Sequence, residues 1–217
     1  DTLAAAYAEA GRFAEAEQTA RQAIEVAKAA MARRSQAETV GHQADEYRVP
    51  RLTCMNKMDR VGADFYASVE SMREKLGAHP VIIQLPLGAE DRFQGVIDLV
   101  KMKAIIWDED SLGATFREVE IPAEMGAEAQ EYREKLLEAL AEKDDPLMEK
   151  YLGGQEIGAD DIQRVLRTAT LKFELVPILC GAALRNKGIQ PLLDAIVDYL
   201  PPPLEVPAVQ GFNPQTG

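Results

Sequence analysis

Two short apolar runs, each followed by polar or very small residues, constrain the fold of this chain more than any other feature. "VPRLTCM" (49–55) leads into "NKMD" (56–59), and "LVPILC" (175–180) leads into "GAAL" (181–184). Apolar runs of this length, bounded by turn-forming residues, favour buried strands. Helical patterns follow both runs, and this alternation predicts a parallel α/β sheet.

A different module separates the two buried strands. Three β-prone segments, "PVIIQLPLG", "FQGVIDLV" and "KAIIWD", are divided by turn residues. Helical periodicity is predicted at 35–47, 64–76, 124–143, 160–173 and 189–200, and Pro201–Pro203 stops the last helix. The expected core residues of the module are Ile83, Leu85, Val96, Ile97 and Ile105. The fold class is therefore α/β, a parallel sheet carrying a large α+β insertion.

The first 30 residues differ from the rest because they are rich in Ala and Glu, and they fall in a predicted helical hairpin at 1–34. The spacing of Tyr7, Gly11, Ala16 and Ala23 resembles one tetratricopeptide helical hairpin. A single such unit does not bury its own apolar face. We expect it to dock on the remaining chain, to pair with a protein partner, or to stay loosely ordered.

Composition limits the possible ligands and compartments. With 24 Lys and Arg against 36 Asp and Glu, the net charge is −12, so no direct nucleic-acid binding is expected. No apolar run reaches the roughly 20 residues of a bilayer span, and the first residues do not form a signal peptide. The two cysteines, Cys54 and Cys180, lie in apolar runs and are expected to be free buried thiols. The expected location is cytoplasmic.

The residues after the two strands fit the edge of a guanine base. The carboxyl ends of strands are where open α/β sheets bind ligands. The Asp59 carboxylate can accept hydrogen bonds from guanine N1–H and the 2-amino group, a donor pair that adenine does not have. Asn56 can bridge to the purine or to the neighbouring loop, the stem of Lys57 can cover the base, and the Ala183 N–H can donate to guanine O6. The plainer interpretation is that Asn and Asp are ordinary turn residues here.

Other groups of residues give weaker indications of a functional site. "DEDSLGATFREVE" (108–120) begins like a calcium loop but has Leu112 and Val119 where ligands are required, so a solvated acidic turn is favoured. His42 and His79 have no partner at metal-ligand spacing, and no nucleophile motif such as GxSxG is present. Trp107 is expected in the core or at an interface.

Five segments, in order, resemble the translational GTPase elongation factor G. They are "VPRLTCMNKMDRVGADFY", "PVIIQLPLGAE", "GVIDLVKMKAI", "LMEKYLGG" and "VPILCGAALRNKGIQPLLDAIVDYLPPP". The resemblance runs from about Ser35 to Pro207. It implies that Asn56, Lys57 and Asp59 form the guanine-specificity motif. It also implies that Ala182, Ala183 and Leu184 form the loop that closes over the base.

The resemblance also implies a domain division and partners. Residues 35–79 and 172–203 correspond to the base-binding half of an incomplete P-loop-GTPase-type domain. Residues 80–171 correspond to the G′ insertion, which in the family contacts the ribosomal stalk protein, and 204–217 to the start of a truncated following domain. Residues 1–34 would be the tetratricopeptide-like addition. The ribosome is the implied partner, and no membrane partner is expected.

Two departures from the family qualify these implications. Ala182 replaces a Ser whose hydroxyl helps to orient the motif's Asp. The chain also contains no GxxxxGK[ST], so it has no phosphate loop and no Mg²⁺ site of that kind. We therefore expect GTP or GDP to bind weakly or not at all, and no hydrolysis by this chain alone, which leaves its status as an enzyme open. The alternatives are a non-enzymatic module that binds the stalk, or a gene remnant.

Overall fold

The structure, a computed structural model, describes residues 39–108, 113, 115–202, 204 and 205. The chain divides into two compact units, residues 1–47 and 48–217. In the first unit residues 39–46 are helical, as predicted for this part of the segment 35–47. The predicted hairpin at 1–34 lies outside the described residues. Everything below concerns the second unit.

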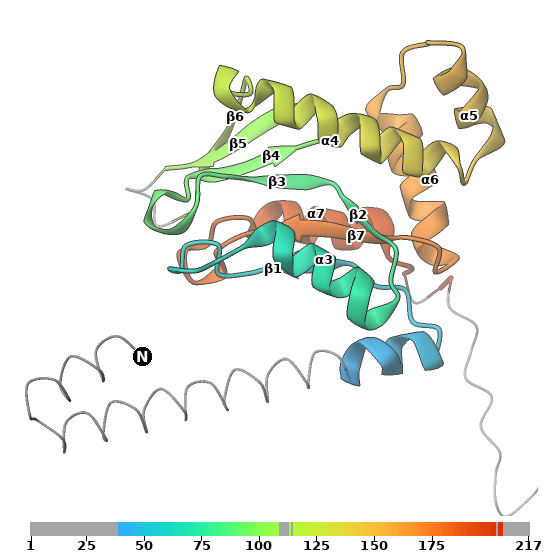
Figure 1. Cartoon of the computed structure of the whole chain (residues 1–217), viewed down its shortest axis with the longest axis horizontal. Helices are drawn as coiled ribbons and strands as arrows, with labels where there is room; N and C mark the ends of the chain where they lie inside the picture. The colour runs from blue at the N-terminus through green and yellow to red at the C-terminus, as the bar shows by residue number, and fades with distance from the viewer. Residues whose placement is uncertain (1–38, 109–112, 114, 203, 206–217) are drawn as a thin grey trace, which may run out of the picture. The chain divides into compact units, whose positions relative to one another are not determined.

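A three-stranded parallel sheet forms one layer of this unit. Its strand order is β1-β7-β2, from β1 (Thr53–Met55), β7 (Val176–Cys180) and β2 (Pro80–Ile82). Helices α3 (Phe65–Leu76) and α7 (Ile189–Tyr199) lie on opposite faces of the sheet (Figure 1). Asp64 caps α3 by accepting a hydrogen bond from the Ala67 N–H at 2.9 Å. The predicted fold class is confirmed.

The segment 80–88, predicted as one strand, is divided between two sheets. After β2 the chain passes through Ile83 and continues as β3 (Gln84–Leu87) in a second, antiparallel sheet. The Ile83 N–H donates to the Ile178 carbonyl at 3.1 Å, while the Ile83 carbonyl accepts from the Leu99 N–H at 3.0 Å. One residue therefore hydrogen-bonds to both layers, and the two sheets share a continuous core.

The antiparallel sheet is a simple meander. It consists of β3, β4 (Gly95–Asp98), β5 (Lys103–Trp107) and β6 (Phe116–Val119), in that order. The five core residues expected here are all buried, and so is Trp107. Strand β6 was not predicted, because its residues are mostly exposed and polar and do not form an apolar run.

Three helices complete the unit: α4 (Ala123–Ala141), α5 (Asp145–Leu152) and α6 (Ala159–Leu171). Arg133 of α4 donates to the carbonyls of Leu99, Val100 and Ile157, which ties the helix to the antiparallel sheet. Arg167 of α6 donates to the carbonyls of Asp198 and Leu200, so it satisfies acceptors at the end of α7. Through these contacts, α4 and α6 connect the antiparallel sheet to the C-terminal end of α7.

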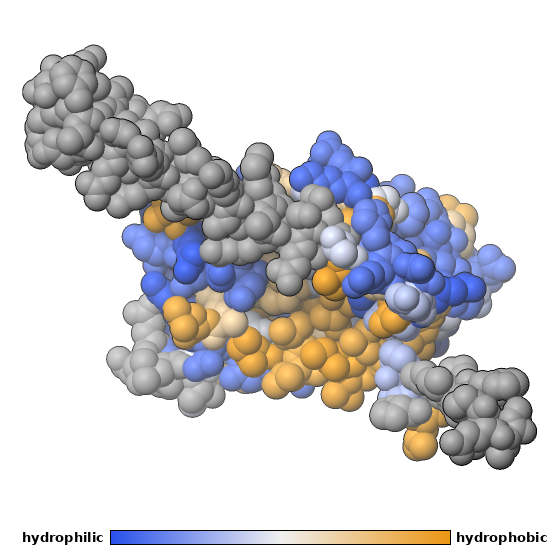
Figure 2. Space-filling view, turned by 90° about the horizontal axis from the view of Figure 1, so that it is seen from below, coloured by the Kyte–Doolittle hydropathy of each residue, from blue (hydrophilic) through white to orange (hydrophobic). Residues whose placement is uncertain are grey.

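The parallel sheet ends at β1. Among the described strands β1 pairs with β7 only, and its three residues are half-buried. β1 is the lowest strand of the sheet in Figure 1, and the view from below in Figure 2 shows a broad apolar area on this side. Helix α7 carries three exposed apolar side chains, which are Leu193, Ile196 and Val197. Exposed apolar areas of this kind are where soluble proteins bind partners.

The cap of α5 gives a test of stability against pH. Asp144 accepts from the Leu147 N–H at 3.0 Å, and both its oxygens pair with Arg164, at 2.8 and 3.0 Å. The hydrogen bond from Arg164 lowers the pKa of Asp144 below its ordinary value of 3.8. A depressed folded-state pKa means that this stabilisation is present above the unfolded-state pKa and is lost as the pH falls through the folded-state pKa.

We expect Asp144→Ala to lower the free energy of unfolding by about 1–2 kcal/mol at pH 7. The difference should shrink as the pH falls from about 4, where the unfolded-state carboxylate begins to bind a proton, towards the lower folded-state pKa of Asp144. Urea unfolding at several pH values measures both effects, and Asp144→Asn, which keeps the cap acceptor, should cost less. A loss for Asp144→Ala that is constant down to pH 2 would contradict the assignment.

Candidate functional site

The first loop, residues 56–62, begins where β1 ends. Asn56 and Lys57 are exposed at its tip, whereas Met58 is buried and anchors the loop in the core. Lys57 has φ +68°, in the left-handed region that non-glycine residues rarely adopt. The Asp59 side chain is only 13% exposed. The loop is therefore held in one conformation, with polar groups at its surface.

The second loop, residues 181–188, begins where β7 ends and folds back on itself. The Ala182 N–H donates to the Lys187 carbonyl at 2.9 Å, and the Lys187 N–H donates back to the Ala182 carbonyl at 3.2 Å. A Cβ at Gly181 would lie 2.7 Å from the Lys187 carbonyl oxygen, so only glycine fits this return. A short 3-10 turn, η3 (Ala183–Arg185), puts Leu184 at the tip, 94% exposed.

Hydrogen bonds join the two loops directly. The Asn56 Oδ1 accepts from the Lys57 N–H at 2.8 Å and from the Ala183 N–H, across the gap between the loops, at 3.0 Å. The Met58 N–H donates to the Gly181 carbonyl at 3.1 Å. The structure thus brings the two predicted tips together. It also places the Ala183 N–H, which was expected to donate to a base, on Asn56.

Asp59 has a partner that sequence reasoning missed. Its Oδ2 lies 3.1 Å from Nε of Arg185, a side chain that is about half exposed. Ala182, by contrast, is buried and offers only a methyl group. The sequence contained one signal for this contact: a cation, Arg185, stands three residues after Ala182, in a loop expected beside Asp59.

Glu90 and Lys187 also contact the loops and were not anticipated. The Gly62 N–H donates to Glu90 Oε1 at 2.9 Å, and Nζ of the buried Lys187 donates to the Phe93 carbonyl at 3.0 Å. Both contacts connect the loops to the turn between β3 and β4. No local sequence pattern indicates either contact, because the partners are 28 and 94 residues apart.

The two cysteines lie on the neighbouring strands beneath the loops, and both are free. Burial raises the pKa of Cys54 from 9.0 to about 11, and that of Cys180 well above its ordinary value. At neutral pH both thiols are therefore protonated and are poor nucleophiles. Among the described residues, no group of three or more His, Cys, Asp or Glu side chains is arranged to hold a metal ion.

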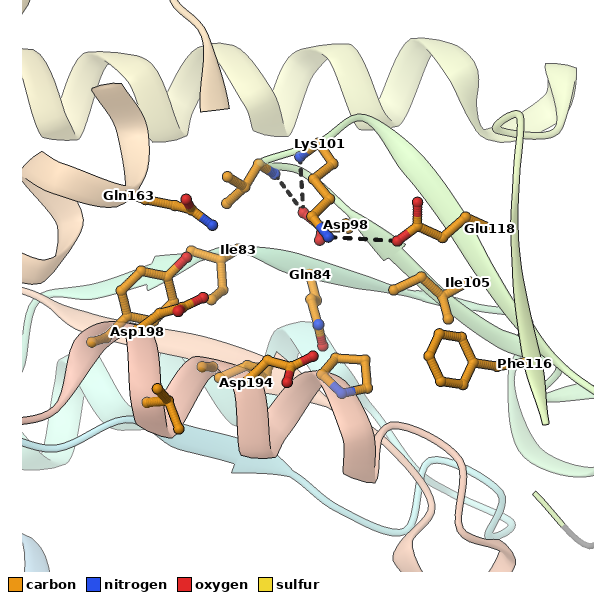
Figure 3. A pocket seen from close by; sticks show the side chains of 16 residues that line it. Ile83, Gln84, Asp98, Lys101, Ile105, Phe116, Glu118, Gln163, Asp194 and Asp198 are labelled. Atoms are coloured by element: carbon orange, nitrogen blue, oxygen red, sulfur yellow. Dashed lines mark hydrogen bonds and ion pairs between the residues drawn. The ribbon is translucent and has the colours of Figure 1, made fainter. Parts of the chain in front are cut away.

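A separate cavity of about 330 Å³ lies between the antiparallel sheet and α7 (Figure 3). Its lining includes four carboxylates and one lysine, which are Asp98, Glu118, Asp194, Asp198 and Lys101. No residue of the two loops lines it. Burial raises the pKa of Asp98, although its carboxylate accepts from the Val100 and Lys101 N–H groups. An excess of negative charge disfavours phosphates, so this cavity does not suit a nucleotide.

No helix in the described part of the chain is both long enough and apolar enough to cross a bilayer.

Comparison with known proteins gives two findings. Residues 12–202 match the family described as the elongation factor Tu GTP binding domain. Among solved structures, the chain is similar to the crystal structure of ttk003000868 from Thermus thermophilus, with 33% sequence identity and a TM-score of 0.64. That alignment covers 75% of this chain and 24% of the Thermus protein, so this chain spans about a quarter of its length.

The raised thiol pKa values predict slow alkylation. An increase from 9.0 to about 11 lowers the thiolate fraction of Cys54 near neutral pH about a hundredfold. We expect N-ethylmaleimide to modify the native chain much more slowly than it modifies free cysteine, and the Cys54 rate to rise about tenfold per pH unit up to about pH 10. Mass spectrometry of timed samples measures this, with urea-unfolded chain as the fast control. Native modification as fast as that of the unfolded chain would contradict it.

Proposed function

The chain belongs to the family of the elongation factor Tu GTP-binding domain, and on that premise we propose that its two joined loops read the base of a guanine nucleotide. The observation that carries the proposal is the pairing of β1 with β7. The register sets Met55 opposite Cys180, so Asn56–Asp59 and 181–184 leave the sheet side by side. Ligands of open α/β sheets bind beyond such strand ends.

Asp59 supplies the specificity in this proposal. Its two carboxylate oxygens match the N1–H and 2-amino donors of guanine, whereas adenine has no such donor pair. Arg185 holds Oδ2 in the nucleotide-free chain. Because the Arg185 side chain is half exposed, the ion pair is weak, and guanine donors can bind the carboxylate beside Arg185.

Arg185 also compensates for Ala182. The resemblance to elongation factor G implies a Ser hydroxyl at position 182 that orients the motif's Asp. The buried methyl of Ala182 does not donate a hydrogen bond, whereas the Arg185 guanidinium reaches the same carboxylate from the same loop. We assign Arg185 the orienting role in this chain.

The other predicted residues form the walls of the base site. Asn56 keeps the second loop in place through Ala183, and Ala182 and Ala183 allow a ligand to approach the backbone closely. Exposed Lys57 and Leu184 flank the opening, where the lysine stem and the leucine side chain can cover the two faces of a base.

The phosphates have no comparable site in this sequence. No GxxxxGK[ST] occurs among the 217 residues, so neither a backbone cradle nor its Lys and Mg²⁺-binding hydroxyl is available from this chain. We therefore propose that the base supplies most of the nucleotide affinity. The wider role, as an elongation-factor-G-like part of a translocation factor on the ribosome, belongs to the same proposal.

A protein-binding role for the insertion is the second candidate. Strand β6 is the outer strand of the antiparallel sheet, and Phe116, Arg117 and Glu118 on it are exposed. An exposed edge of this kind can receive a further strand from a partner. The ribosomal stalk protein is the partner that the resemblance suggests.

Calorimetric titration of the chain with GDP, and with ADP as the control ligand, tests base reading. We expect heat with GDP only. Asp59→Ala should weaken GDP binding about 10- to 100-fold, since hydrogen bonds to a charged group contribute roughly 1.5–3 kcal/mol. Asp160→Ala, which removes an exposed carboxylate at the start of α6, should bind like wild type. Equal heats for GDP and ADP, or full binding by Asp59→Ala, would sink the proposal.

Measuring phosphate release from GTP tests hydrolysis separately from base binding. Phosphoryl transfer requires cations placed around the γ-phosphate. We expect no release above the buffer rate from the 217-residue chain, with or without Mg²⁺. Catalytic release that follows the chain through purification would show that a phosphate site exists which the sequence does not reveal.

A further inference from the structure

The turn between β3 and β4, residues 88–94, is held in a single compact shape; we refer to it as the clamp. Gly88 has φ +82°, and a Cβ there would lie 2.1 Å from the Arg92 carbonyl oxygen. Hydrogen bonds close the turn from the Gln94 N–H to the Leu87 carbonyl at 2.9 Å and from the Phe93 N–H to the Glu90 carbonyl at 3.1 Å. Phe93 is fully buried beneath it.

Glu90 connects the clamp to the first loop by two hydrogen bonds. Its N–H donates to the Met58 carbonyl at 3.0 Å, and its Oε1 accepts from the Gly62 N–H at 2.9 Å. These bonds lie on either side of Asp59. Glu90 itself has φ +55°, a left-handed conformation that is costly for a residue with a side chain. Strain of this kind persists only where the surroundings hold it, and it gathers at functional sites.

Lys187 connects the clamp to the second loop. Its side chain is buried, at 5% exposure, and its Nζ donates to the Phe93 carbonyl at 3.0 Å. Its backbone forms the bridge with Ala182 that shapes the loop. Because a buried ammonium is costly unless it is hydrogen-bonded, this contact strongly restricts where the second loop can lie.

Gln190, just beyond the second loop, adds a further connection to the antiparallel sheet. Its Oε1 accepts from the Trp107 Nε1–H at 3.1 Å, and its Nε2 donates to the Gly113 carbonyl at 3.2 Å. The second loop is thus fastened to the sheet at both Phe93 and Trp107.

We propose that Glu90 and Lys187 are positioning residues for base recognition: the clamp sets the distance between the two loops, so guanine affinity depends on the antiparallel sheet. This inference rests on the proposed function. Neither residue touches the base; Glu90 acts through the backbone around Asp59, and Lys187 through the backbone around Ala182. By linkage, a partner that displaces the clamp would change guanine affinity, and bound guanine would change the affinity of that partner by the same factor.

The test compares Glu90→Ala, Glu90→Gln and the control Asp160→Ala, which removes an exposed carboxylate outside the clamp and the two loops. Hydrogen exchange of the nucleotide-free chain reports the tether without any ligand. Glu90→Ala should speed exchange at the Gly62 amide about tenfold or more, because its acceptor is removed. Calorimetry should then show GDP binding weakened about three- to tenfold. Glu90→Gln keeps an acceptor oxygen and should restore both values, and Asp160→Ala should change neither.

The outcomes separate the two proposals. If wild type shows no guanine selectivity, the proposed function fails, and the positioning role fails with it. If wild type selects guanine but Glu90→Ala binds GDP equally well while exchange accelerates, Glu90 only stabilises the fold and the positioning role alone is overturned. Lys187→Met gives a second variant, for which we expect faster exchange at Ala182 and Ala183 and weaker GDP binding. Equal GDP binding by folded Lys187→Met would count against the role of Lys187.

Discussion

The parallel pairing of β1 with β7 is the constraint on which the rest of the structure depends. With Met55 opposite Cys180, both strands stop at the same level, and the ladder continues beyond them as the Gly181 N–H donates to Met55 and the Met58 N–H to Gly181. This continuation brings Asn56 within reach of Ala183. A shift of one residue in the register would turn every side chain of the shifted strand to the opposite face and separate these groups.

The two loops that leave this pairing, and the clamp that contacts them, contain energetically unfavourable features. Lys57 and Glu90 adopt left-handed backbone conformations, and Lys187 buries a charged group. Such features are tolerated where a well-packed core holds them. Here the core runs without interruption from the parallel to the antiparallel sheet, because Ile83 hydrogen-bonds to both. The antiparallel sheet is therefore part of the support of the two loops.

Sequence patterns predicted most strands and helices, which depend on residues close together in sequence. They missed the contacts between residues that are far apart in sequence. The runs 49–55 and 175–180 contain β1 and β7, and α3, α4, α6 and α7 lie within about two residues of their predicted bounds. The change of sheet at Ile83 was missed because the one polar residue of "PVIIQLPL", Gln84, is buried and does not mark a turn. Helix α5 was not predicted, because it is short and its capping residue, Asp144, resembles a turn residue. The partners of Asp59, Glu90 and Lys187 could not be predicted, since nothing near them in sequence specifies which distant atom they meet.

The most direct test of the account is to observe where a guanine base binds on this chain. Amide chemical shifts of the labelled chain, followed during titration with GMP and separately with AMP, report the binding site residue by residue. The account predicts that GMP alone perturbs residues 56–62 and 181–188, with smaller changes in the clamp at 88–94. Perturbations centred on the acidic cavity between the antiparallel sheet and α7, or equal perturbations by AMP, would contradict it. So would the absence of any perturbation in a folded sample.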